Sequence, residues 1–218
     1  MKRTLATIIT PAMLLALFGC SSGNQEKPNP ATPGGQTTAA TQSADSEHHG
    51  EALTGRVAFQ KMYVAARNWS PDAQGFRLES QTTSDANGAE GKSAVWRARF
   101  GSRARTAAKP MLWSGSSDPD APSRGLDAGG EDSFNPSNSS TRPFDIAFLK
   151  ADSDKAFQVA QEHGGKKVLQ KNPKTPVYYL LQWDPQKNTL VWHVSYGDRG
   201  DPRIAVNAST GEFIRVEK

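Results

Sequence analysis

The sequence predicts an α+β fold in two units, each with one helix packed on an antiparallel β-meander. The main observation is an internal repeat. Residues 58–60 (AFQ) recur as residues 156–158, 98 positions later, and residues 95–101 (VWRARFG) resemble residues 191–197 (VWHVSYG), 96 positions later. The matches keep their order and nearly the same offset, which indicates a duplicated unit. Helical spacing of apolar residues followed by period-2 alternation in both halves indicates the helix and strands.

The N-terminus resembles the signal sequence of a bacterial lipoprotein. Lys2 and Arg3 precede an apolar stretch of about 14 residues, which is shorter than the roughly 20 needed to span a bilayer. The stretch ends in LFGC at residues 17–20, which resembles a lipobox, although Phe18 is bulkier than the usual small residue. The alternative is an ordinary secretory signal with an incidental cysteine. The resemblance implies a signal peptide at residues 1–19 and a lipid on the Cys20 thiol.

Lipidation at Cys20 has consequences for location. Several acyl chains on one residue anchor a protein stably, so a membrane is an expected partner. The next residue is Ser21 rather than Asp, which in lipoproteins of Gram-negative bacteria favours the outer membrane, facing the periplasm. Cys20 is the only cysteine, so no disulfide is expected and the fold relies on its apolar core. Removal of residues 1–19 removes two cations and lowers the formal net charge from +4 to +2.

Residues 20–50 are predicted to form a disordered tether. They are rich in Ser, Gly, Gln, Thr, Ala and Pro and contain almost no large apolar residue, so they cannot bury enough surface to offset their ordering entropy. His48 and His49 could suggest a metal site. No carboxylate or cysteine cluster accompanies them, which favours a solvated pair.

The first predicted unit, residues 51–114, begins with an amphipathic helix that Pro71 ends. This stripe of aromatic and apolar side chains indicates core packing rather than a cofactor site. Its members are Phe59, Met62, Tyr63, Ala66 and Trp69. Strands are expected at residues 76–81, 94–100 and 111–113.

Residues 115–142 are predicted to form a flexible linker. They are rich in Ser, Pro, Gly and Asp, and Leu126 and Phe134 are their only large apolar residues. Residues 144–148 alternate apolar with small or polar side chains, which predicts a short strand leading into the second unit.

The second predicted unit, residues 143–218, repeats the helix and the strands. Asp152 is a candidate helix cap, and Gly164 and Gly165 are expected to close the helix after His163, a boundary residue. Strands are expected at residues 177–183, 189–196, 203–206 and 213–216. A turn at residues 207–211 (NASTG) joins the last two, with Asn207 bonding the backbone ahead of it and Gly211 supplying a positive φ.

A strand followed by this turn and a further strand resembles the end of a PepSY-type domain, a module also found in propeptides of thermolysin-like peptidases. The resemblance covers residues 152–218 well and residues 53–113 weakly, because the first unit lacks the Asn-x-x-Thr-Gly turn. It implies a cystatin-like arrangement of helix and sheet. It also implies a non-catalytic domain that binds a protein or peptide and could modulate a peptidase. The alternative is an envelope scaffolding lipoprotein with no peptidase connection.

No motif predicts an enzyme or a cofactor. The sequence contains no G-x-S-x-G, H-E-x-x-H, P-loop or dinucleotide-binding pattern. His193 is the best single candidate for chemistry, but it alternates with the apolar Trp192 face, and Arg97 is its counterpart in the first unit. A solvated face is therefore expected, with no catalytic, cofactor-binding or metal-binding residue.

A basic run lies in the first unit, with no acid between its ends. Its members are Lys92, Arg97, Arg99, Arg103, Arg105 and Lys109. Nucleic acid would suit the charge, but an exported protein seldom meets it. A solvated face is the simple interpretation, and contact with anionic headgroups, lipopolysaccharide or an acidic partner is the functional one.

Overall fold

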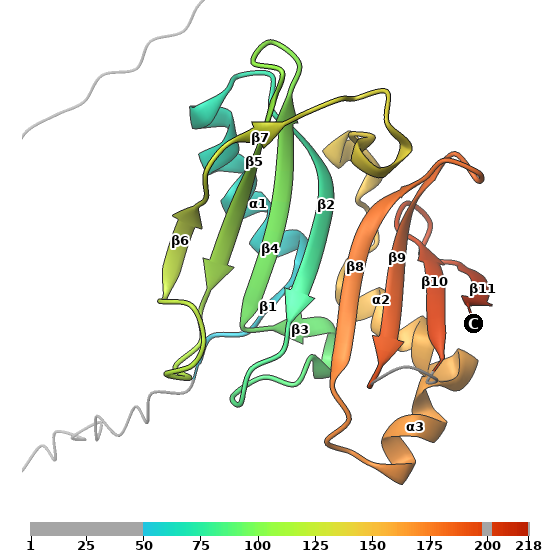
Figure 1. The fold of residues 1–218 in the computed structure, drawn as a ribbon. Helices are drawn as coiled ribbons and strands as arrows, with labels where there is room; N and C mark the ends of the chain where they lie inside the picture. Colours follow the sequence, from blue (N-terminus) through green and yellow to red (C-terminus); the bar gives the residue numbers. More distant parts are fainter. Residues whose placement is uncertain (1–49, 198–201, 218) are drawn as a thin grey trace, which may run out of the picture. The chain divides into compact units, whose positions relative to one another are not determined.

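A computed structural model describes residues 50–197 and 202–217. The chain has an α+β fold in which helices pack on one face of a large antiparallel sheet (Figure 1). The predicted signal peptide, Cys20 and nearly all of the predicted tether lie outside the described residues.

The first half of the fold follows the predicted pattern of one helix and antiparallel strands. The helix α1 spans Gly55–Trp69 and ends two residues before Pro71. It buries most of its predicted apolar stripe, of which Tyr63 and Trp69 are only partly buried. The main strands are β2 (Gln74–Gln81), β4 (Val95–Ser102) and β5 (Ala107–Ser114). Two short strands, β1 (Leu53–Thr54) and β3 (Lys92–Ser93), pair with each other beside the main sheet.

The segment between the halves differs from the sequence prediction. Residues predicted as a flexible linker include β6 (Gly125–Ala128) and β7 (Asp132–Ser133), and both pair with β5. The prediction of a strand at residues 144–148 is wrong. A 3₁₀ helix spans Ile146–Phe148 instead, because the Asp145 carboxylate caps it by accepting a hydrogen bond from Ala147 N at 2.9 Å.

The second half contains more helix than predicted. After α2 (Ser153–Ala160), a π-helical turn at Gln161–Gly165 leads into α3 (Lys166–Lys171), so the two glycines bend the helix rather than end it. Gly164 carries the bend with a φ of 125°. The strands are β8 (Val177–Asp184), β9 (Thr189–Tyr196), β10 (Arg203–Asn207) and β11 (Phe213–Glu217).

The strands of the two halves form one sheet. Its order is β11-β10-β9-β8-β2-β4-β5-β6, and β7 also pairs with β5. The halves join where β2 and β8 pair antiparallel, with Leu78 opposite Leu181. Each half therefore supplies its first long strand to the centre of the sheet and extends outward from there (Figure 1).

One apolar cluster lies between the helices and this sheet. It includes Phe59 and Met62 of α1, Val159 of α2, and Trp96 and Trp192 of the two halves. Within residues 50–197 and 202–217, neither half has a separate main core. A small second cluster, made of Phe76, Ala108 and Phe134, lies on the opposite face, where Phe134 lies close over Gly101.

Candidate functional site: the open face of the sheet

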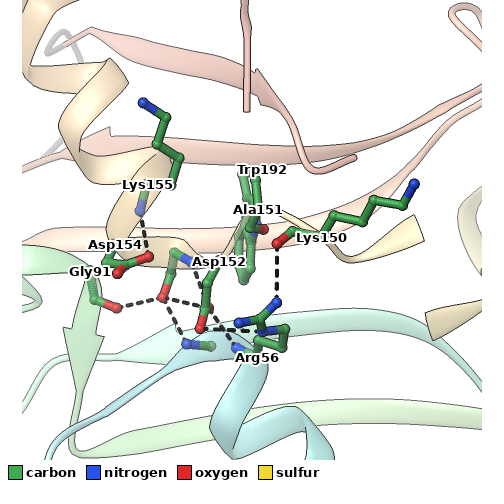
Figure 2. Close-up of polar contacts among 10 residues, drawn as sticks. Arg56, Gly91, Lys150, Ala151, Asp152, Asp154, Lys155 and Trp192 are labelled. Carbon is green, nitrogen blue, oxygen red and sulfur yellow. Dashed lines mark hydrogen bonds and ion pairs between the residues drawn. The ribbon is translucent and has the colours of Figure 1, made fainter. Parts of the chain in front are cut away.

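The N-termini of α1 and α2 meet at Asp152 (Figure 2) and at its neighbour Ser153, which both bond the first backbone N–H groups of α1. One Asp152 oxygen, Oδ1, accepts hydrogen bonds from Arg56 N at 2.8 Å and from Ser153 N at 2.6 Å. The Ser153 hydroxyl accepts from Gly55 N at 2.7 Å and donates to Gly91 O at 2.5 Å. The cap predicted at Asp152 is confirmed, and it serves both helices. The polar groups of this cluster form hydrogen bonds with one another, so the cluster has a structural role and connects the N-termini of the two helices.

His193 is not on the solvated face that the sequence predicts. Its side chain is buried, and its Nδ1 lies 2.8 Å from Glu217 Oε2. Glu217 Oε1 accepts from Arg215 Nη2 at 2.6 Å, and Arg215 Nη1 donates to Asp184 Oδ2 at 3.3 Å. The sheet register explains this burial, because only the small Ala205 of β10 separates His193 from Arg215 of β11. The network links β11 to β8 and β9.

The six residues of the basic run lie in different environments. Arg97 and Arg99 are exposed on the face of β4 opposite the buried Trp96, so their predicted polar side is confirmed. Arg103 is exposed in the turn after β4.

The other cations of the run have local partners. Lys92 Nζ lies 3.9 Å from Glu90 Oε2. Arg105 Nη2 donates to Glu131 Oε1 at 3.0 Å, and its guanidinium lies 5.4 Å from the Trp69 ring centroid. Lys109 Nζ lies 6.0 Å from the same centroid. The six cations therefore do not form one continuous surface.

A cavity of about 390 Å³ opens on the sheet face that α1 and α2 leave uncovered. It lies over β5, between the side chains of β2 and β4 and the chain around β6. Its lining includes Glu79, Arg97, Arg99, Pro110, Leu112, Pro122 and Asp127. The volume falls in the range of small-ligand pockets, roughly 300–1,000 Å³.

Three arginines, Arg77, Arg97 and Arg99, stand beside this cavity against two carboxylates, Glu79 and Asp127. Glu79 stands directly opposite Arg97 in the sheet, but its carboxylate accepts a hydrogen bond from Arg77 Nε at 2.8 Å. Arg99 stands opposite Arg77, so like charges face each other. Within residues 50–197 and 202–217, neither Arg97 nor Arg99 has a carboxylate at ion-pair distance. Among the described residues, these two guanidinium groups therefore have no anionic partner, which suits them to bind an external anion.

Sequence reasoning found Arg97 and Arg99 but missed Glu79, Pro110, Leu112 and Asp127. Alternation along each strand gives the outward direction of these residues. Only the register between strands shows that they share a site, and that register places Arg97 opposite both Glu79 and Leu112.

The part of the chain that the structure describes contains neither a cluster of metal ligands nor a membrane-spanning helix. No group of three or more His, Cys, Asp or Glu side chains in it is arranged to hold a metal ion. None of its helices combines the length and apolar character needed to cross a bilayer.

Comparison with protein-family models, with curated proteins and with solved structures finds no match to this chain.

Proposed function

We propose that this chain is a non-catalytic binding module of the bacterial cell envelope, attached to a membrane through lipid on Cys20. It binds a protein or peptide partner with the open face of its sheet. The observation that carries the proposal is the cavity on the open face, with two arginines that have no carboxylate at ion-pair distance within residues 50–197 and 202–217. The order of a helix followed by antiparallel strands, which both halves share, supports two PepSY-like units arisen by duplication, and this resemblance makes a peptidase the first partner to test.

Site-specific photo-crosslinking in cells tests the binding face. A photoreactive residue replaces Leu112, which lines the cavity, or Val64, which is 63% exposed on the helical side. A third position, Val216 in the edge strand β11, tests binding by strand addition. The proposal expects a discrete crosslinked protein at Leu112 and none at Val64. The absence of a product at Leu112, or equal products at Leu112 and Val64, contradicts it.

The identity of the crosslinked protein separates the two forms of the proposal. A secreted peptidase supports modulation of proteolysis, and inhibition is then measured directly with that peptidase. An envelope-assembly protein supports the scaffolding alternative.

Membrane attachment has its own test. Cys20→Ser removes the thiol that carries the lipid, so the variant is expected to stay unprocessed or to leave its normal membrane. Mass spectrometry of the mature N-terminus detects the lipid. A mature, membrane-bound Cys20→Ser protein that still carries acyl chains contradicts the anchor.

A further inference from the structure

The cavity on the open face has one cationic wall and an apolar centre. Arg97 and Arg99 stand two residues apart on β4 and point to the same side. Leu112 is the direct cross-strand neighbour of Arg97, and Pro110 is that of Arg99. A ligand that reaches the guanidinium groups therefore also contacts apolar side chains on β5.

The cationic wall favours a carboxylate. The Arg77–Glu79 ion pair neutralises one of three neighbouring arginines and leaves Arg97 and Arg99 against the single carboxylate of Asp127. Like charges opposite each other destabilise a sheet, and a bound anion offsets that repulsion. The planar guanidinium group binds a carboxylate through two parallel hydrogen bonds. The complementary group is a carboxylate joined to a short apolar body.

An anionic membrane fits this site poorly. Residues 117–132, of which Pro122, Asp127 and Gly129 line the cavity, contain five acidic residues but only one basic residue, Arg124. Asp127 of β6 lines the cavity itself and is exposed. A flat anionic surface that approached Arg97 would also approach these acids, within the Debye length of about 8–10 Å over which charges repel.

We propose that this cavity binds a peptide segment in which an acidic side chain stands next to an apolar one. The carboxylate binds Arg97 and Arg99, and the apolar side chain packs on Leu112 and Pro110. This inference rests on the proposed binding function and specifies the partner chemistry.

Peptide binding to the full chain in phosphatidylcholine nanodiscs tests the inference. The probes are a fluorescein-labelled peptide GGLELEGG and its uncharged counterpart GGLQLQGG, measured by fluorescence anisotropy up to millimolar concentration. Arg97→Gln and Arg99→Gln each remove one charge from the cavity wall. Arg103→Gln is the matched control, because it removes the same charge from an exposed turn residue that does not line the cavity.

The acidic peptide is expected to bind about tenfold more tightly than its counterpart, the effect of losing a charge-assisted hydrogen bond. Arg97→Gln and Arg99→Gln are expected to weaken it about tenfold, and Arg103→Gln to leave it unchanged. Circular dichroism confirms that each variant is folded. Equal binding of the two peptides, no binding of either, or an equal loss in Arg103→Gln overturns the inference.

Two further outcomes separate the inference from the proposed function. Phosphatidylglycerol vesicles that bind through Arg97 and Arg99 while both peptides fail overturn the inference in favour of a membrane contact. A partner crosslinked at Leu112 that persists in Arg97→Gln and Arg99→Gln also overturns it, but leaves the binding function standing. Peptide binding in the predicted order, with no crosslinked partner in cells, supports the site and contradicts the proposed function.

Discussion

The indole rings of Trp96 and Trp192 meet edge to face, with centroids 6.3 Å apart and planes at 68°. Both side chains are fully buried. Trp96 Nε1 donates to Leu53 O at 2.9 Å, and Trp192 Nε1 donates to Ala151 O at 3.0 Å. Each accepting carbonyl lies two residues before the helix of its own half. Corresponding residues of the two halves therefore make the same bond and also touch each other.

Asp152→Ala is expected to destabilise both helices. The variant removes an acceptor for Arg56 N of α1 and for Ser153 N of α2. A lost cap costs about 0.5–2 kcal/mol, so two caps predict a loss of about 2 kcal/mol in the free energy of unfolding, measured with urea. Asp152→Asn keeps an oxygen acceptor and should lose less. A shared cap is excluded if Asp152→Ala is as stable as the unsubstituted chain.

Gly91→Ala is expected to disturb the contact between the first half and α2. Gly91 has a φ of 77°, and a Cβ there would lie 2.3 Å from the backbone of Asp154. The positive φ alone costs about 1–3 kcal/mol, and the backbone clash adds to it. Gly130→Ala is the control, because a Cβ there meets no atom within 4 Å. Equal thermal stability of the two variants would show that α2 does not pack against Gly91.

The stability of the turn after α1 should depend on acid pH through Asp72. The Ser102 hydroxyl at 2.6 Å, Ala104 N at 2.9 Å and the Ser70 hydroxyl at 2.7 Å donate to this carboxylate and hold its pKa well below the ordinary value. A lowered folded-state pKa stabilises the fold above the unfolded pKa of about 3.9, and this contribution is lost as the pH falls further.

Asp72→Asn tests this dependence by urea unfolding between pH 2 and pH 7. The variant should be less stable than the unsubstituted chain at pH 7, and the difference should shrink below about pH 4 as the carboxyl of the unsubstituted chain is protonated in the unfolded state. A difference that stays constant down to pH 2 would show that the hydrogen bonds do not favour the ionised form.

Local patterns in the sequence predicted the elements that bury an apolar stripe or close a tight turn. The turn after β10 is an example, and its prediction is confirmed. Asn207 Oδ1 accepts from Ser209 N at 2.8 Å, and Gly211 has a φ of 77°. By contrast, β6 was missed because all of its residues are exposed and only backbone pairing with β5 defines it.

Local patterns do not predict which strands pair over long sequence distances. The pairing of Leu78 with Leu181 joins strands about 100 residues apart, and no local signal specifies it. The burial of His193 also depends on strand pairing, because β10 pairs with β9 on one side and with β11 on the other. The cavity depends on the registers of three strand pairs, β2–β4, β4–β5 and β5–β6. The sequence therefore identified its two arginines but not the residues that lie beside them.

The two halves share one core, and Trp192→Ala tests this most directly. Removal of this buried aromatic side chain is expected to cost about 3–5 kcal/mol. Native-state hydrogen exchange on the unsubstituted chain and the variant then reports each helix and strand separately. A shared core predicts a similar loss of protection in α1, β2 and β4 as in α2, β8 and β9. Loss confined to the second half would contradict it.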